Sequence, residues 1–207
     1  MNERSFIFVP EMRVRDTHKE LLVKQKAIEL FLKDGFDGFS MQKLAKACGI
    51  SVGTLYIYYK NKEDLILKVG IEEGERMMEA TMKGFSPDMS FPEGLKKQWE
   101  NRASYWLKNK ESSLFFENIK HTQYAEAILD EISNGFRPVM TQFVKNSIAK
   151  KQLHFLSFES YWSVAFGPLY TLLKFEQNGK SVGNKPYKFS KQVMYQTLEL
   201  VLKALTP

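Results

Sequence analysis

The sequence has little cysteine and histidine and no long apolar run. Its 207 residues include a single cysteine, Cys48, and three histidines. One cysteine cannot form an internal disulfide, and the scattered histidines give no Cys/His spacing typical of a metal site. No apolar stretch approaches the roughly 18 residues of a membrane span, and none near the N-terminus resembles a signal-peptide core. We therefore expect a soluble, cytoplasmic protein with no cofactor, no metal and no membrane partner.

Sequence signatures of common enzyme classes are also missing. The chain has no HExxH zinc motif, no nucleophile elbow, no phosphate-binding glycine loop and no paired-carboxylate signature. We expect that the protein is not an enzyme and has no catalytic residues.

Aromatic residues and positive charge are what the chain has in plenty. Aromatic residues make up 14% of the sequence, with 16 Phe, 9 Tyr and 3 Trp. The formal net charge is +6, and residues 1–62 hold 11 Lys and Arg against 7 Asp and Glu. A basic excess is weak by itself, but it favours nucleic-acid contact where it coincides with a binding motif.

Apolar residues recur at helical spacing along most of the chain, and no strand alternation interrupts them. The predicted fold is all-α. Pro138 and Pro168 predict kinks within two of the helices. The predicted helices cover residues 17–33, 41–48, 61–83, 92–109, 112–120, 124–151, 157–178 and 187–205, with one further short helix that begins after Ser51.

Two short helices occupy little sequence in FSMQKLAKACGISVGTLYIYYKNKEDL. Ser40 and Ser51 can each cap the first turn of a helix, and Gly49 can end the first helix in a left-handed conformation. Ala45 and Leu55 are spaced so that both helices share one small core. This pattern predicts a helix-turn-helix.

The ordered motif resembles TetR-family transcriptional regulators over about residues 17–67. The resemblance implies an arm and a three-helix DNA-binding domain in residues 1–62, and a larger helical ligand-binding and dimerisation domain in residues 63–207. Residues 61–83 would form the connecting helix. The implied function is that of a homodimeric repressor that leaves a near-palindromic operator in double-stranded DNA when a small, largely apolar or aromatic ligand binds. A body that docks a protein partner and binds no small molecule is the alternative.

The second short helix carries most of the expected DNA contacts. A helix presented by a helix-turn-helix can enter the major groove, and small residues at its start allow close approach to the bases. Tyrosine hydroxyls and lysine can bind phosphates, while Tyr59 is expected to turn inward. Gln42 can read adenine, or it can be an exposed glutamine without a role. The predicted DNA-binding residues are Gln42, Val52, Gly53, Thr54, Tyr56, Tyr58 and Lys62.

The larger domain holds all three tryptophans and most of the phenylalanines. The resemblance implies that some of these rings line an effector pocket, although rings at helical spacing can also form an ordinary core. The ligand candidates are Trp99, Arg102, Tyr105, Trp106, Phe115, His121, Phe143, Tyr161, Trp162 and Tyr170.

The final helix carries two columns of apolar residues, which suit the dimerisation bundle that the resemblance implies. The predicted interface residues are Val193, Met194, Thr197, Leu198, Val201 and Leu202. In the connecting helix, Gly70 and Gly74 can permit bending or close packing against a neighbour, and the sequence leaves both explanations open.

Overall fold

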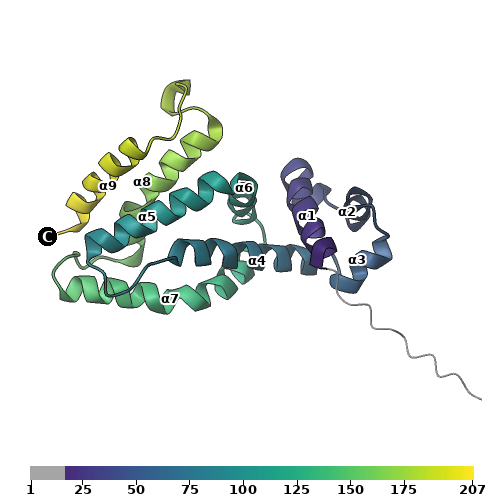
Figure 1. Ribbon diagram of the computed structural model, residues 1–207, viewed down its shortest axis with the longest axis horizontal. Helices are drawn as coiled ribbons and strands as arrows, with labels where there is room; N and C mark the ends of the chain where they lie inside the picture. The colour runs from purple at the N-terminus through teal and green to yellow at the C-terminus, as the bar shows by residue number, and fades with distance from the viewer. Residues whose placement is uncertain (1–16) are drawn as a thin grey trace, which may run out of the picture. The chain divides into compact units, whose positions relative to one another are not determined.

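The computed structural model describes residues 17–207, and its regular elements are helices (Figure 1). Within these residues the only β-type pairing is an isolated bridge between Lys180 and Pro186. The all-α prediction is therefore confirmed, while the predicted N-terminal arm lies outside the described residues. No helix of the described chain is long and apolar enough to cross a membrane. The chain divides into two compact units, one ending at Lys62 and the other comprising Glu63–Pro207.

The N-terminal unit contains α1 (Thr17–Gly38), α2 (Met41–Cys48) and α3 (Val52–Tyr58). The caps of α2 are the residues that the sequence predicts. The Ser40 hydroxyl accepts from the third residue of α2, and Gly49 ends that helix with a φ of 65°. Local chemistry alone therefore sets the turn between the two short helices.

A small aromatic and aliphatic core holds these three helices together. The Phe31 and Phe39 rings lie 4.2 Å apart, and Leu44 and Leu55 are fully buried. Tyr59 is only 2% exposed, which confirms that it turns inward.

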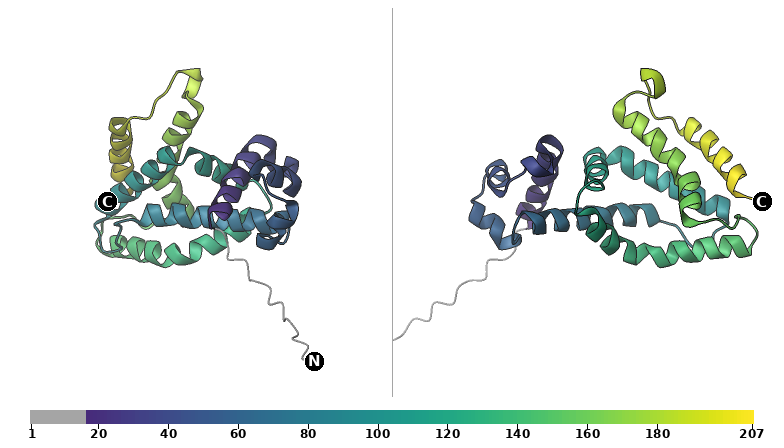
Figure 2. Two further views of the ribbon diagram at one scale, coloured as in Figure 1. Left: turned by 45° about the vertical axis from the view of Figure 1, so that its right-hand side comes forward. Right: turned by 180° about the vertical axis from the view of Figure 1, so that it is seen from behind.

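The second unit is a larger helical body (Figure 1). It contains α4, which begins at Lys62, one residue before the unit itself, followed by five further α-helices and one 3-10 turn. The α9 helix runs back along α8 (Figure 2), and α5 packs on α8. Pro138 and Pro168 lie inside α7 and α8. The bounds are α4 (Lys62–Met82), α5 (Phe91–Lys108), α6 (Lys110–Ile119), α7 (Ala125–Ala149), α8 (Phe158–Asn178), η1 (Val182–Asn184) and α9 (Lys191–Leu205).

The last helix begins four residues later than the sequence predicts. Its N-cap is Ser190, which is extended, and residues 187–189 before the cap are not helical. Two of their backbone amides are bound at the end of α8. The Tyr187 amide donates to the Gly179 carbonyl at 3.0 Å, and the Phe189 amide donates to the Glu176 carboxylate at 2.6 Å. These contacts outside the helix explain the later start.

The two glycines of α4 permit close packing. A Cβ at Gly70 would lie 2.4 Å from Cδ1 of Ile128 on α7, and one at Gly74 would lie 2.7 Å from Cγ2 of Ile132. A Cβ at Gly74 would also meet the Phe116 ring at 2.9 Å. Of the two explanations that the sequence leaves open, the structure supports packing.

Gly74→Ala is expected to lower the free energy of unfolding by about 1–3 kcal/mol, because an added methyl must displace buried neighbours. Gly135→Ala is the matched control, since a Cβ at that helical position meets nothing within 4 Å. The control should raise stability by up to about 1 kcal/mol through helix propensity. Urea unfolding measures both, and equal effects of the two changes would contradict close packing at Gly74.

Candidate functional site

The start of α3 is held by its capping residue. The Ser51 hydroxyl accepts from the Thr54 backbone amide at 3.1 Å and shares a second hydrogen bond with the Thr54 hydroxyl at 2.9 Å. Ser51 is exposed and Thr54 is half-buried. The Thr54 hydroxyl is thus oriented by Ser51, so any contact with another molecule must share or replace that bond.

One face of α3 is exposed and mixes a glycine with large side chains. Gly53, Tyr56 and Ile57 share this face at i, i+3 and i+4, with Tyr56 51% and Ile57 63% exposed. A Cβ on Gly53 would meet no atom nearer than the Ser51 hydroxyl at 3.7 Å. The fold therefore has room for a larger residue at position 53, and what glycine uniquely provides there is an open surface.

Ile57 has no assigned role in the sequence-based predictions. Ile57 lies four residues after Gly53, and residues four apart lie on the same face of a helix. The sequence alone could therefore have placed Ile57 on the face that carries Gly53. We refer to Gly53, Tyr56 and Ile57 as the α3 face. Val52 and Tyr58 flank it and are half-buried.

The neighbouring α2 contributes an exposed polar edge. Gln42 and Lys46 are exposed. Lys43 is held within the domain, because its Nζ donates to Asp34 Oδ2 at 2.8 Å and to the Gly38 carbonyl at 2.7 Å. The hydrogen bond from Lys43 holds the pKa of Asp34 below its ordinary value. Of the two lysines of α2, Lys46 is therefore the one not engaged by Asp34.

A buried guanidinium lies inside the second unit. Arg102 of α5 is 5% exposed; its Nη1 donates to the Tyr170 hydroxyl at 2.8 Å and its Nη2 to Gln98 Oε1 at 3.2 Å. The guanidinium also lies 4.6 Å from the Phe166 ring centre and 5.6 Å from that of Trp162. Each such ring contact stabilises a cation by about 0.5–2 kcal/mol. Burial of an ion costs several kcal/mol, so rings alone do not offset it.

A cavity of about 10 Å³ lies beside this guanidinium. Burial raises the pKa of one lining residue, Tyr105, to about 12. Burial likewise raises the pKa of the nearby Tyr161 to about 12, while the positive charge of Arg102 acts in the opposite direction. The cavity is lined by Met77, Thr81, Arg102, Tyr105, Trp106 and Tyr170.

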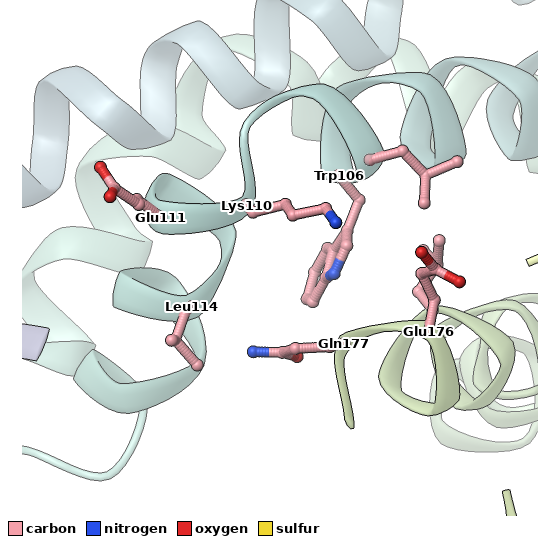
Figure 3. Close-up of a pocket in the computed structure, with 8 residues that line it drawn as sticks. Trp106, Lys110, Glu111, Leu114, Glu176 and Gln177 are labelled. Carbon is pink, nitrogen blue, oxygen red and sulfur yellow. The ribbon is translucent and has the colours of Figure 1, made fainter. Parts of the chain in front are cut away.

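A larger pocket of about 220 Å³ opens between α5, α6 and α8 (Figure 3). The Trp106 indole points into it, with Leu114 on one side and Glu176 and Gln177 on the other. Trp106 lines the small cavity as well. The indole therefore borders both spaces. The remaining lining residues of the pocket are Leu107, Lys110, Glu111 and Leu173.

The helix-turn-helix matches a known protein family. A family model described as bacterial regulatory proteins of the tetR family matches residues 25–69, which include α2 and α3 in full. Residues 25–69 therefore carry a helix-turn-helix of the TetR family. This kinship confirms the resemblance drawn from the motif, and it agrees with the prediction that the protein is not an enzyme.

Curated relatives match part of this chain. An uncharacterised HTH-type regulator of Bacillus subtilis, YuxN, is 34% identical over 87 residues, covering 40% of this chain and 30% of the relative. An uncharacterised HTH-type regulator of Haemophilus influenzae is 30% identical over 91 residues, covering 44% and 47%. The matches therefore span less than half of either relative.

The likeness of fold extends over nearly the whole chain. A TetR-family transcription regulator of Marinobacter aquaeolei VT8 superposes with a TM-score of 0.80 and covers 94% of this chain and 99% of its own. Because the two sequences are only 23% identical, the comparison supports the fold and nothing about function.

Several ring residues predicted to bind a ligand are buried in the core of the body. Trp99, Phe115 and Phe143 are 0% exposed. The Trp99 indole donates to the Ala165 carbonyl at 2.7 Å, and Phe143 stacks on Phe91 with centroids 6.0 Å apart. These three rings are packed inside the body and line neither the small cavity nor the pocket beside Trp106. His121 is exposed and also lines neither of these two spaces. Their part in ligand binding stays a prediction.

The remaining ligand candidates cluster around Arg102. Tyr105, Trp106 and Tyr170 line its cavity, Trp162 lies against its guanidinium, and Tyr161 is buried nearby.

The predicted dimer surface of α9 divides into two faces. Met194, Leu198 and Val201 are 2%, 3% and 5% exposed within a single chain, because they pack into the core of the body. Their place in a dimer interface stays a prediction, and within a single chain their side chains are already covered. Leu202 is half-buried and packs against the same core. The outer face carries Val193, Thr197 and Leu200, of which Leu200 is 66% exposed.

Proposed function

We propose that this protein is a sequence-specific DNA-binding regulator of transcription. The observation that carries the proposal is the α3 face. It belongs to a capped helix in a TetR-family helix-turn-helix, and Gly53 leaves its surface open where the fold does not require glycine. A surface of this kind can approach base edges in the major groove.

Each DNA contact follows from the chemistry of its residue. Val52 and Ile57 can contact a thymine methyl, and the hydroxyl of Thr54 can bond to a base or a phosphate. Tyr56, Tyr58 and Lys62 can donate to phosphates, and the exposed Gln42 can pair with adenine.

The regulator is proposed to act as a homodimer through the outer faces of α8 and α9. Leu200 and Val193 lie exposed on α9, and Phe158 at the start of α8 is 69% exposed. Phe155, in the preceding loop, is 88% exposed. Exposed apolar side chains in such number favour a protein interface, and a two-fold axis would present two α3 helices to a near-palindromic operator.

Control is proposed to be repression relieved by a small ligand bound in the body. The pocket beside Trp106 supports this reading, since a body without a cavity would favour the alternative of a docked protein partner. At about 220 Å³ the pocket is smaller than the roughly 300–1,000 Å³ typical of drug-sized ligands. A small effector, or one that enlarges the pocket as it binds, is therefore expected.

Selection of binding sites from random double-stranded DNA tests the proposal with the purified protein. The expected product is a near-palindrome whose half-sites lie about one helical turn, roughly 34–36 Å, or more apart. Recovery of no enriched sequence would contradict sequence-specific binding. An enriched but asymmetric single site would retain DNA binding and contradict the dimer.

A further inference from the structure

The guanidinium of Arg102 has no acidic partner. Among residues 17–207, no carboxylate lies within ion-pair distance of it. The buried carboxylate of Glu73, on α4, has its own partner and accepts from Arg76 Nη1 at 2.6 Å. A positive charge is thus enclosed in the body without a compensating negative charge.

The same guanidinium retains unused hydrogen-bond donors. Its Nη1 and Nη2 each make one hydrogen bond, to Tyr170 and Gln98, and its Nε makes none. Two further buried hydroxyls, those of Thr81 and Tyr161, also find no hydrogen-bond partner within residues 17–207. Buried donors are normally bonded, and arginine cannot discharge itself by losing its proton.

The cavity beside Arg102 and Thr81 has a volume of about 10 Å³, which is room for no more than about one water-sized atom. Arg102, Thr81 and the Tyr170 ring line the same cavity. A carboxylate is planar and accepts two parallel N–H bonds from a guanidinium, here from Nε and an Nη. It would neutralise the charge and satisfy the free donor together.

We propose that Arg102 binds the acidic group of the effector, which is therefore a small monocarboxylic acid with an apolar body. The inference rests on the proposed function, because it assigns a chemical class to the ligand of the same domain.

The apolar body of the acid belongs in the pocket beside Trp106. This indole lines both the 220 Å³ pocket and the small cavity, and it packs edge-on against Tyr170 at 5.5 Å. A rotation of the Trp106 side chain would join the two spaces and give a carboxylate the room that the 10 Å³ cavity lacks. The acid then reaches Arg102 from the pocket, and the displaced indole transmits binding to α5.

Calorimetry and thermal unfolding of the full chain test the proposal with matched probes. The acids are acetate, octanoate, phenylacetate and 4-phenylbutyrate, and each is compared with its neutral amide. We expect at least one acid to bind and its amide to bind at least about tenfold more weakly. Arg102→Gln should weaken acid binding by about 30-fold or more, and Arg102→Lys should weaken it less because it keeps the charge.

Arg137→Gln is the matched control, since Arg137 is an exposed arginine of α7, and it should leave acid binding unchanged. Thermal unfolding of the variants without probe shows whether they fold. If Arg102→Gln unfolds, Arg102→Lys still decides the matter: unchanged acid affinity in that variant would overturn bidentate recognition. Failure of every acid to bind would overturn the inference.

Operator release separates this inference from the proposed function. Release by acids in the unsubstituted protein, lost in Arg102→Gln, supports both. Release by neutral amides with equal strength in Arg102→Gln would overturn the anionic site and leave ligand-controlled repression intact.

Discussion

Gly53→Ala is expected to weaken operator binding by about tenfold or more while leaving the protein as stable as before, or more stable. Among the described residues, 17–207, the methyl group meets no atom closer than 3.7 Å, so the fold accommodates it. Alanine is also favoured over glycine in a helix by up to about 1 kcal/mol. In the DNA complex the same methyl enters a closely packed surface, where an extra carbon typically costs about 1–3 kcal/mol.

Urea unfolding and fluorescence anisotropy on the selected operator measure the two effects of Gly53→Ala. Gly135→Ala is the control, because it makes the same change at an unhindered helical position of the other unit. It should stabilise the protein and leave operator affinity unchanged. Unaltered operator affinity in Gly53→Ala would remove α3 from the DNA interface, whereas lost stability would show that the glycine serves the fold.

The helix-turn-helix could be predicted closely because its determinants are local. Ser40, Gly49 and Ser51 act on backbone groups within a few residues of themselves, so their roles follow from sequence spacing. The inward Tyr59 follows from helical phase in the same way. The same argument could have placed Ile57 on the exposed face, because it lies four residues after Gly53 on the same helix.

The candidate ligand site could be predicted only in part, because helical spacing does not distinguish an aromatic residue in the core from one that lines a pocket. Trp99 and Trp106 lie seven residues apart on one face of α5, yet Trp99 is bonded into the core and Trp106 borders the pocket. The difference depends on where α6 and α8 cross α5, and that crossing is set by long-range packing. Arg102 stood among the candidates, but its lack of an acidic partner is a property of the folded body.

The last helix shows the same limit in a different form. Two apolar columns one residue apart run along α9, and the sequence cannot say which meets its own chain. Met194, Leu198 and Val201 form the inner column. The outer column of Val193, Thr197 and Leu200 is what remains for a partner subunit, and Leu200 is the residue on which this division can be tested.

Leu200→Glu is expected to weaken dimerisation by at least about 100-fold. In a two-fold interface every substitution occurs twice, so two carboxylates would be placed in an apolar contact, and unpaired or like charges there cost several kcal/mol. The free energy of unfolding of the single chain should change by no more than about 0.5 kcal/mol, because the Leu200 side chain is 66% exposed in it. Sedimentation over a range of protein concentrations measures the effect.

Leu129→Glu provides the control, since Leu129 is 45% exposed on α7 and lies outside the proposed interface. It should dimerise normally. Operator binding by Leu200→Glu should fall with the dimer population, because a single α3 makes too few contacts to hold one half-site. A stable dimer of Leu200→Glu would place the two-fold axis elsewhere. A monomer that still binds the full operator tightly would show that the DNA interface does not depend on pairing.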